Sequence, residues 1–266
     1  MKNNFNVVGD VAGNFLTLQA LLAQMPKDAE LICLGDPVDR GPRSKQVVEF
    51  LMNNGRTINS NHAHMMVTEW YQHHSPGSYP RYYDRGIWPQ DNGGMATVFS
   101  YGADENWMGK LDRLIPGEHI KFLENCPMYI ESDDFVMTHA PARQYGTLEE
   151  MSELGKGFTR FKFDYVSDFS LLWNRYVPAR PNLELKGKIN IFGHNASDDV
   201  KVYTTQYPQG IKVFNTEGLK TILDDKEKYE VYAIAIDTSK PDYAGNKKLT
   251  GLHLPTMTLY FQEYID

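Results

Sequence analysis

The order of strands and helices expected in the first 60 residues most constrains how this chain can fold. Three short runs predict strands, at 5–8, 31–34 and 56–59. Apolar residues at helical spacing predict helices between them, at 15–25 and 44–54, the second capped by Ser44. Because strands joined through a helix run parallel in one sheet, this alternation predicts a βαβαβ unit and an α/β fold.

The remaining chain adds strands and one irregular segment. Strands are expected at 128–130, 135–138, 188–192, 232–236, 249–254 and 256–262, and a helix at 116–125. Residues 67–102 have no clean period, so we expect a helix followed by an excursion over the site. Its aromatic residues either line a substrate groove or pack the loop down: Trp70, Tyr71, Tyr82, Tyr83 and Trp88. Without a repeat or linker, a single domain over residues 1–266 with two sheets is predicted.

Polar side chains stand where several of these strands end. Asp10, Asp36 and Asn61 follow the first three strands, so the carboxyl ends of parallel strands bring them to one edge of the sheet. His139 and His194 each close a later apolar strand. Each alone could be a core or surface residue. Together they are oxygen and nitrogen donors without thiolates, which suits Mn²⁺, Zn²⁺ or Fe²⁺, and Asp36 could bridge two ions about 3.5–4 Å apart.

Charge and composition argue against several partners. The net charge is −7 and the pI is about 5.6, whereas nucleic-acid binding needs a basic surface. No apolar run reaches the roughly 18 residues of a membrane span, and we find no signal peptide. Cys33 and Cys126 are isolated and lack motif spacing, which is typical of a reducing cytoplasm. We therefore expect a cytoplasmic globular protein that binds neither nucleic acid nor membrane; its oligomeric state is unknown.

Five blocks of this sequence resemble, in order, the motifs of the phosphoprotein phosphatase family of metallophosphoesterases. The blocks are Gly9–Asn14 (GDVAGN), Gly35–Gly41 (GDPVDRG), Asn61-His62, His139-Ala140 and Gly193-His194. They span most of the chain, and five blocks in one order are a specific signal. The likeness is greatest to the bacterial and phage branch typified by the bacteriophage lambda phosphatase. It implies a calcineurin-like four-layer sandwich, in which two mixed β-sheets are flanked by helices.

The resemblance implies a pair of divalent ions, with Mn²⁺ expected and Fe or Zn as alternatives. One ion would be held by four residues, Asp36, Asn61, His139 and His194. Asp36 would be shared with a second ion, which Asp10 would help to hold. The reaction implied is direct, in-line attack of a metal-bound hydroxide on phosphorus, without a phosphoenzyme.

The resemblance also implies four catalytic residues. His62 would protonate the leaving oxygen, and Asp39 would keep this ring oriented and positively charged. Arg40 would clamp the phosphoryl oxygens together with Arg175, which lies in a segment similar to the family's second phosphate-binding arginine.

One ligand of the family is missing from this chain. The first motif normally has a histidine that ligates the ion beside Asp10, and Ala12 occupies its position. Ser60 also replaces the usual glycine, and Ala63 the usual glutamate. The chain is then a natural branch in which the ion site beside Asp10 is completed by water or another side chain, a variant from which the histidine was removed, or a relative that binds phosphate without hydrolysing it. His64 is unsuited as the replacement because it would face away, so we expect the second ion to be weak or absent.

A metal-dependent phosphomonoesterase of the Ser/Thr protein phosphatase type is favoured because all four catalytic residues persist. Its partner would be a phosphorylated protein or a small phosphate ester. Two alternatives stay open. Symmetrical dinucleoside polyphosphate hydrolases resemble the same family but often carry another residue in place of Asp39, and a phosphate-binding relative inactivated by Ala12 would bind without turnover.

Overall fold

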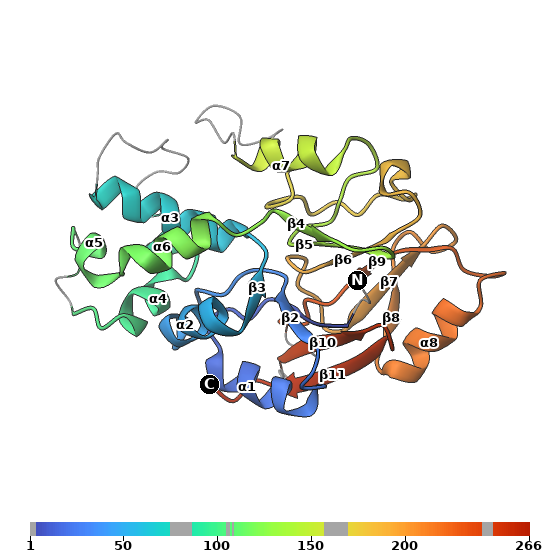
Figure 1. The fold of residues 1–266 in the computed structure, drawn as a ribbon, viewed down its shortest axis with the longest axis horizontal. Coiled ribbons are helices and arrows are strands. Elements are labelled where there is room, and N and C mark those ends of the chain that lie inside the picture. Colours follow the sequence, from blue (N-terminus) through green and yellow to red (C-terminus); the bar gives the residue numbers. More distant parts are fainter. Residues whose placement is uncertain (1–3, 75–86, 105–106, 108, 157–169, 241–246) are drawn as a thin grey trace.

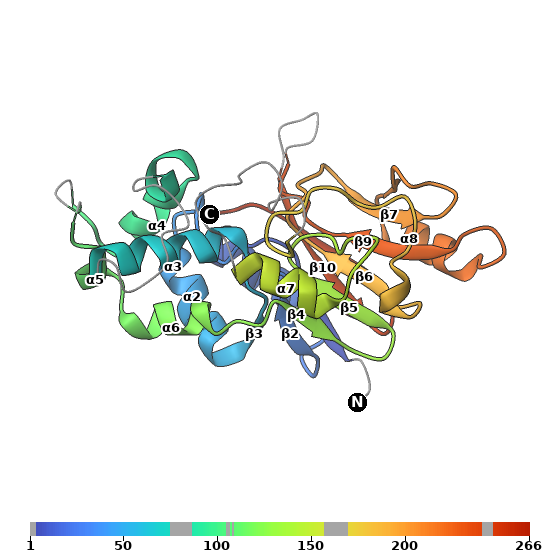
Figure 2. The ribbon, with the colours of Figure 1, turned by 90° about the horizontal axis from the view of Figure 1, so that it is seen from above.

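Two β-sheets lie face to face at the centre of the molecule, with helices outside them (Figures 1 and 2). The structure, a computed structural model, describes residues 4–74, 87–104, 107, 109–156, 170–240 and 247–266. The first sheet has five strands in the order β11-β10-β1-β2-β3, and the second has six in the order β4-β5-β6-β9-β7-β8. Both are mixed, because β10 pairs antiparallel with β1 in one sheet and β7 pairs antiparallel with β9 in the other.

The elements have the following bounds. The first sheet contains β1 (Phe5–Val8), β2 (Glu30–Cys33), β3 (Gly55–Thr57), β10 (Lys248–Leu254) and β11 (Thr258–Glu263). The second contains β4 (Tyr129–Glu131), β5 (Phe135–Thr138), β6 (Ile189–Phe192), β7 (Val200–Thr204), β8 (Ile211–Val213) and β9 (Val231–Ala235). The α-helices are α1 (Phe15–Gln24), α2 (Ser44–Asn54), α3 (Asn61–His74), α4 (Gly94–Ser100), α5 (Leu111–Leu114), α6 (Gly117–Glu124), α7 (Leu148–Lys156) and α8 (Thr216–Asp224). A π-helical turn, η1 (Ile87–Asp91), and a 3₁₀ turn, η3 (Leu183–Leu185), complete them.

The space between the two sheets is filled by apolar side chains from both. Val7 and Ile32 of the first sheet pack in one cluster with Met137, Ile191 and Ile234 of the second. Successive residues of a strand face opposite sides of its sheet, so the residues next to these in each strand point outward and can pack against the outer helices. Burying each such side chain contributes about 1.5–3 kcal/mol, which holds the sheets together.

Helices cover the outer face of each sheet. On the first sheet, Val8 and Cys33 share a buried cluster with Leu18 of α1. On the second, Val136 of β5 shares one with Met151 of α7. The layers are therefore helix, sheet, sheet and helix, which confirms the predicted four-layer sandwich and its parallel βαβαβ start.

The segment between β6 and β9 contains three elements for which the sequence showed no clear pattern, β7, β8 and α8. The strands are short, so their alternation covers too few residues to be distinctive. In α8 only Leu219 and Ile222 are buried, and its start is fixed locally because the Asn215 side chain accepts a hydrogen bond from Gly218 N at 2.8 Å. These elements widen the second sheet but leave the predicted strand ends in place.

The predicted cap of α2 is wrong. Arg43 is the N-cap residue, and Ser44 is already inside the helix. Its hydroxyl instead accepts from Asp39 N at 3.1 Å and shares a hydrogen bond with the Thr97 hydroxyl at 2.9 Å. Ser44 therefore ties α2 to the loop after β2 and to α4.

A helical lobe beside the sandwich contains α3, α4, α5 and α6 (Figure 1), and it includes the described part of the excursion predicted at 67–102. Trp70 and Trp88 are buried in its core, and Trp70 Nε1 donates to Ile115 O at 3.0 Å. These two aromatic residues pack the lobe together; Tyr82 and Tyr83 lie outside the described residues. No helix among the described residues has both the length and the apolarity to cross a membrane.

The first turn of α1 is capped by a residue distant in sequence. Asn14, the N-cap residue, makes no side-chain cap bond, but the Asp266 carboxylate accepts from Leu16 N at 3.1 Å and from Thr17 N at 2.8 Å. Its oxygen also lies 3.3 Å from Arg43 Nε, and the carboxylate is fully buried. A carboxylate here satisfies free N–H groups and complements the helix dipole, which fixes the loop between β1 and α1.

Replacing Asp266 by Ala should lower the free energy of unfolding by about 1–2 kcal/mol, because the first turn of α1 loses the carboxylate that accepts from Leu16 N and Thr17 N. Urea denaturation followed by circular dichroism measures this. Glu263→Ala, at an exposed position nearby, is the control and should change stability by less than about 0.5 kcal/mol. Equal stability of the two variants would show that α1 does not depend on this cap.

Candidate metal centre

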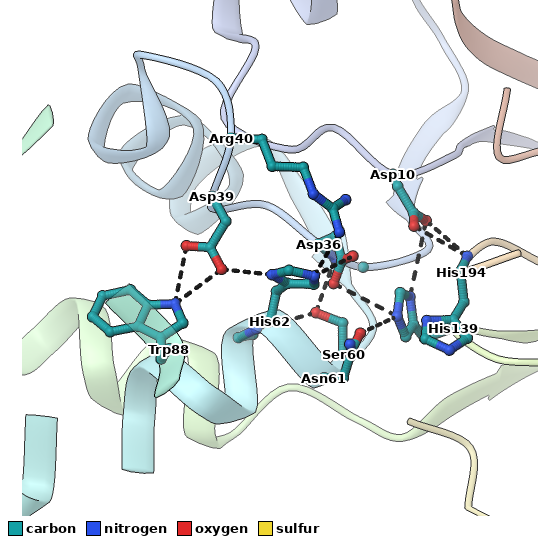
Figure 3. A network of polar contacts seen from close by, with 12 residues as sticks. Asp10, Asp36, Asp39, Arg40, Ser60, Asn61, His62, Trp88, His139 and His194 are labelled. Carbon is teal, nitrogen blue, oxygen red and sulfur yellow. Dashed lines mark hydrogen bonds and ion pairs between the residues drawn. The ribbon is translucent and has the colours of Figure 1, made fainter. Parts of the chain in front are cut away.

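Polar residues from α3 and from loops that follow strands of both sheets surround one cavity of about 400 Å³. Most of the predicted site residues line it: Asp10, Asp36, Arg40, Asn61, His62, Arg175 and His194. The other two predicted residues, Asp39 and His139, are fully buried behind this wall and contact His62 and Asn61. The structure thus brings together all nine residues predicted from strand ends and motifs, and Figure 3 shows eight of them.

The loops that carry these residues adopt an unusual backbone. Seven non-glycine residues in the described chain have positive φ, and five of them belong to these loops: Ala12 (47°), Asp36 (43°), Asp39 (76°), Arg40 (65°) and His194 (59°). A left-handed conformation costs about 1–2 kcal/mol for a residue with a Cβ atom. Such strain collects at functional sites, where surrounding contacts enforce it.

Two glycines allow the site residues to approach one another. A Cβ atom at Gly193 would overlap Asp10 Oδ1, and one at Gly35 would lie 2.6 Å from His139 Nδ1. Any side chain at these positions would push a predicted ligand out of the cluster.

Three atoms with lone pairs lie close together: Nε2 of His139, Oδ1 of Asn61 and Oδ1 of Asp36. The Nδ1 atom of His139 lies 3.0 Å from Leu34 O, which must be the acceptor, so the proton of the neutral ring is on Nδ1 and Nε2 is bare. Nε2 faces Asn61 Oδ1 at 2.8 Å and Asp36 Oδ1 at 3.5 Å. Asp36 Oδ1 is buried and has no hydrogen-bond partner. In this arrangement the three atoms repel one another unless a cation lies among them.

His194 presents a second bare nitrogen. Its backbone N donates to Asp10 Oδ2 at 3.0 Å, which joins the strand ends of the two sheets. Its ring lies 4.9 Å from the His139 ring between centroids, and Nε2 is buried without a hydrogen-bond partner. Buried polar atoms are normally paired, so an unpaired imidazole nitrogen next to carboxylates indicates a missing ligand.

The protonation states suit a divalent ion. Burial lowers the pKa of His139 and of His194, so both rings are neutral and have a lone pair to donate. Burial, and then the charges of Asp237 and Asp36, raise the pKa of Asp10 well above its usual value. Asp10, Asp36 and His139 each place a ligand atom within 4.8 Å of the others. These residues therefore fit a divalent cation, which would relieve the repulsion among them.

His62 lies beside this cluster, in the first turn of α3, and is held at both ring nitrogens (Figure 3). Nδ1 is 2.6 Å from Asp39 Oδ2 and Nε2 is 2.9 Å from Arg40 Nη2. Because arginine can only donate, the neutral ring has its proton on Nδ1 and accepts at Nε2. Asp39 thus fixes the tautomer and orientation of the imidazole.

Two residues whose contacts with Asp39 were not predicted hold this carboxylate in place. Trp88 Nε1 lies 3.0 Å and 2.9 Å from its two carboxylate oxygens, and the Thr97 hydroxyl donates to Oδ1 at 2.8 Å. Both come from the irregular segment at 67–102, where Trp88 was expected to line a groove or pack the loop and Thr97 was not singled out. The helical lobe therefore supports the site by orienting the partner of His62.

Ser60 and Asp237 are two further residues of the site that were not predicted as such. The Ser60 hydroxyl accepts from Asp36 N at 2.9 Å, so this side chain helps to fix the loop that carries the Asp36 carboxylate. Asp237 follows β9, is 3% exposed and lines the cavity. An aspartate directly after an apolar strand is the same signal that pointed to Asp10.

Arg40 and Arg175 are exposed residues that reach the cavity from opposite loops. Arg175 Nη1 donates to His194 O at 3.5 Å, a weak bond that a stronger acceptor would replace. Both guanidinium groups can therefore turn to an anion in the cavity, and bidentate arginine bonds suit phosphate oxygens.

Comparison with known proteins identifies the fold. No protein-family profile and no curated protein sequence matches this chain. Solved structures do: a candidate diadenosine tetraphosphatase aligns with 100% of this chain and 96% of its own (TM-score 0.58, 14% identity). A metallophosphoesterase from Sphaerobacter thermophilus aligns with 100% and 89% (TM-score 0.58, 15% identity). A protein serine/threonine phosphatase from Saccharomyces cerevisiae aligns with 99% and 80% (TM-score 0.53, 14% identity). The chain therefore has the calcineurin-like metallophosphoesterase fold.

Replacing Asp39 by Asn should lower the pKa of His62. Burial alone would lower the pKa of this ring, but the charges of Asp36 and Asp39 outweigh it and raise the pKa above 6.5. Removing one negative neighbour disfavours the imidazolium, so protonation shifts to lower pH. NMR titration of the ring nitrogens in the metal-free protein measures this. His64, whose pKa burial lowers to about 4, is the internal control and should not change. A His62 pKa that stays the same or rises in Asp39→Asn would show that Asp39 does not raise the pKa of His62.

Proposed function

We propose that this protein is a metal-dependent phosphomonoesterase that acts on phosphorylated serine or threonine in proteins and on small aryl phosphates. One observation carries the proposal: His62, paired with Asp39, shares a cavity with two arginines and with the unpartnered ligand atoms of Asp36 and His194. A proton donor, phosphate-binding cations and a metal centre are the parts that phosphoester hydrolysis needs.

The metal centre would be formed by Asp36, Asn61, His139 and His194, with Asp10 toward a second position. A divalent ion held there would act as a Lewis acid toward phosphoryl oxygens and lower the pKa of a neighbouring water. The mixed oxygen and nitrogen donors support Mn²⁺, with Fe or Zn as alternatives. The free thiols of Cys33 and Cys126 support a reducing cytoplasm as the compartment.

His62 would supply the proton for the leaving oxygen. Its Nε2 faces the cavity, while Nδ1 stays bonded to Asp39. Protonation of Nε2 breaks the bond from Arg40, because both groups are then donors. The same step prepares His62 as the acid and releases Arg40 to bind a phosphoryl oxygen, so proton uptake and phosphate binding support one another.

A dinucleoside polyphosphate is the second candidate substrate. Lys240 and Lys247 are exposed and line the same cavity as the arginines, so it carries cations beyond those that one phosphoryl group needs. Against it stands Asp39, which the related hydrolases often lack. Comparing kcat/KM for a phosphoserine peptide and for diadenosine tetraphosphate separates the two, and we expect the peptide to be preferred.

The purified protein should hydrolyse p-nitrophenyl phosphate with Mn²⁺ and lose this activity with EDTA. His62→Asn should lower kcat by about 10²–10⁴-fold, because the leaving oxygen loses its acid. His73→Asn, at the other end of α3, is the matched control and should keep full activity. Phosphate binding without turnover under any divalent metal would instead support the non-catalytic alternative.

A further inference from the structure

The Asp39 carboxylate is held from two sides (Figure 3). On one side it pairs with His62, whose Nδ1 lies 2.6 Å from Oδ2. On the other side the helical lobe supplies two donors. Trp88 Nε1 lies 2.9 Å from Oδ2 and 3.0 Å from Oδ1, and the Thr97 hydroxyl donates to Oδ1 at 2.8 Å. To turn about its Cβ–Cγ bond the carboxylate would have to break these bonds, so the lobe determines which lone pair faces His62.

The same part of the lobe fixes the backbone that carries Asp39. Asp39 N donates to the Thr97 hydroxyl at 2.8 Å, and Arg40 N donates to Gly93 O at 3.1 Å. Asp39 and Arg40 both have a left-handed backbone, with φ of 76° and 65°. Residues with a Cβ atom seldom adopt this conformation unless their surroundings enforce it. These contacts therefore help to keep both residues that bond to His62 in place.

The indole ring of Trp88 has little freedom to move. It is 1% exposed and belongs to the buried apolar cluster of the lobe, together with Val38 and Val98. Helix α4 begins directly against the ring, because a Cβ atom at Gly94 would lie 2.7 Å from Trp88 Cε2 and 2.8 Å from Nε1. Packing as well as hydrogen bonding thus aims the N–H group of Trp88 at Asp39.

The orientation of His62 matters most where the leaving group is a strong base. In the step concerned, a water oxygen forms a bond to phosphorus and loses its proton, while the ester P–O bond breaks and leaves its electron pair on the leaving oxygen. That oxygen takes the proton from His62 Nε2, and the ring regains a proton from solvent. A serine alkoxide or a phenolate is much more basic than p-nitrophenolate, so it depends more on this proton.

We propose that Trp88 is a positioning residue for His62: together with Thr97 it fixes the Asp39 carboxylate, and it thereby allows the site to cleave phosphate esters with strongly basic leaving groups, such as phosphoserine. This inference rests on the proposed function, because it takes His62 as the acid. It adds that the helical lobe, through one indole N–H group, determines which leaving groups the site accepts.

The test is Trp88→Phe, which keeps an aromatic ring in the lobe and removes the N–H group. Activity is measured with Mn²⁺ on p-nitrophenyl phosphate, phenyl phosphate and a phosphoserine peptide. Because a small displacement of a reacting group is costly, kcat for phenyl phosphate and the peptide should fall by about 10–100-fold. The loss on p-nitrophenyl phosphate should be at least about 5-fold smaller, and KM for each substrate should change little.

Trp70→Phe is the matched control. This tryptophan is buried in the same lobe and also donates through Nε1, but to Ile115 O at 3.0 Å. Its replacement should therefore leave the ratio of the three rates as in the wild type. An equal loss on all three substrates in Trp88→Phe, or the same change of ratio in Trp70→Phe, would overturn the proposal.

A second measurement does not need turnover. In the metal-free protein the Nδ1 proton of His62 should give a low-field NMR signal, because it lies in a short bond to a carboxylate. The signal should move upfield in Trp88→Phe and stay in place in Trp70→Phe; an unchanged signal in Trp88→Phe would contradict the proposal. If the wild type hydrolyses none of the substrates, the proposed function fails, and this signal still decides whether Trp88 positions His62.

A pair of variants at Thr97 gives the same test if Trp88→Phe does not fold. Thr97→Val keeps the shape of the side chain but lacks the hydroxyl, so it should lose activity mainly on phenyl phosphate and the peptide. Thr97→Ser retains the hydroxyl and should restore the ratio of rates found in the wild type. Equal ratios in these two variants would overturn the proposal.

Discussion

The main constraint on this structure is electrostatic. Carboxylates and imidazoles are held close together and away from water, which is unfavourable unless their charges and lone pairs are compensated. Burial, and then the charges of Asp237 and Asp36, raise the pKa of Asp10. His139 and His194 cannot compensate, because burial lowers the pKa of each ring and leaves it neutral. A polar core would satisfy such groups with hydrogen bonds. Here Asp36 Oδ1 and His194 Nε2 are buried without a hydrogen-bond partner, and this favours a cation site over a purely structural cluster.

The backbone of the site loops is also strained. Asp36 and His194 are held in left-handed conformations at the ends of strands from different sheets. Contacts between those loops enforce the strain: His194 N donates to Asp10, and the Ser60 hydroxyl accepts from Asp36 N. Gly193 is required for the first of these, because a side chain there would overlap the carboxylate. The site is thus the place where the two sheets are joined, so its geometry and the packing of the sheets are not independent.

The residues at strand ends could be predicted from the sequence pattern, whereas His62, Asp39, Arg40 and Arg175 were predicted only from the family resemblance. Apolar runs show where a strand ends, and a polar residue close after that end, such as Asp10 or His194, is recognisable from the sequence alone. Trp88 and Thr97 are not, because they reach Asp39 from 49 and 58 residues away through a segment without a period. Asp237 has the strand-end signal, but only the packing of the two sheets brings it to the cavity. Likewise, the two sheets and their first crossovers followed from periodicity, whereas β7, β8 and α8 did not.

Arg40 couples the two halves of the site. When the His62 ring is neutral, the Arg40 guanidinium donates to His62 Nε2 at 2.9 Å. The ring therefore cannot be protonated at Nε2 without losing that bond. An anion in the cavity that draws Arg40 away makes protonation of His62 easier, and by linkage a protonated His62 makes Arg40 more available to the anion. Asp39 opposes neither step, because it stays bonded to Nδ1 in both states. A phosphate dianion in the cavity would thus raise the population of protonated His62.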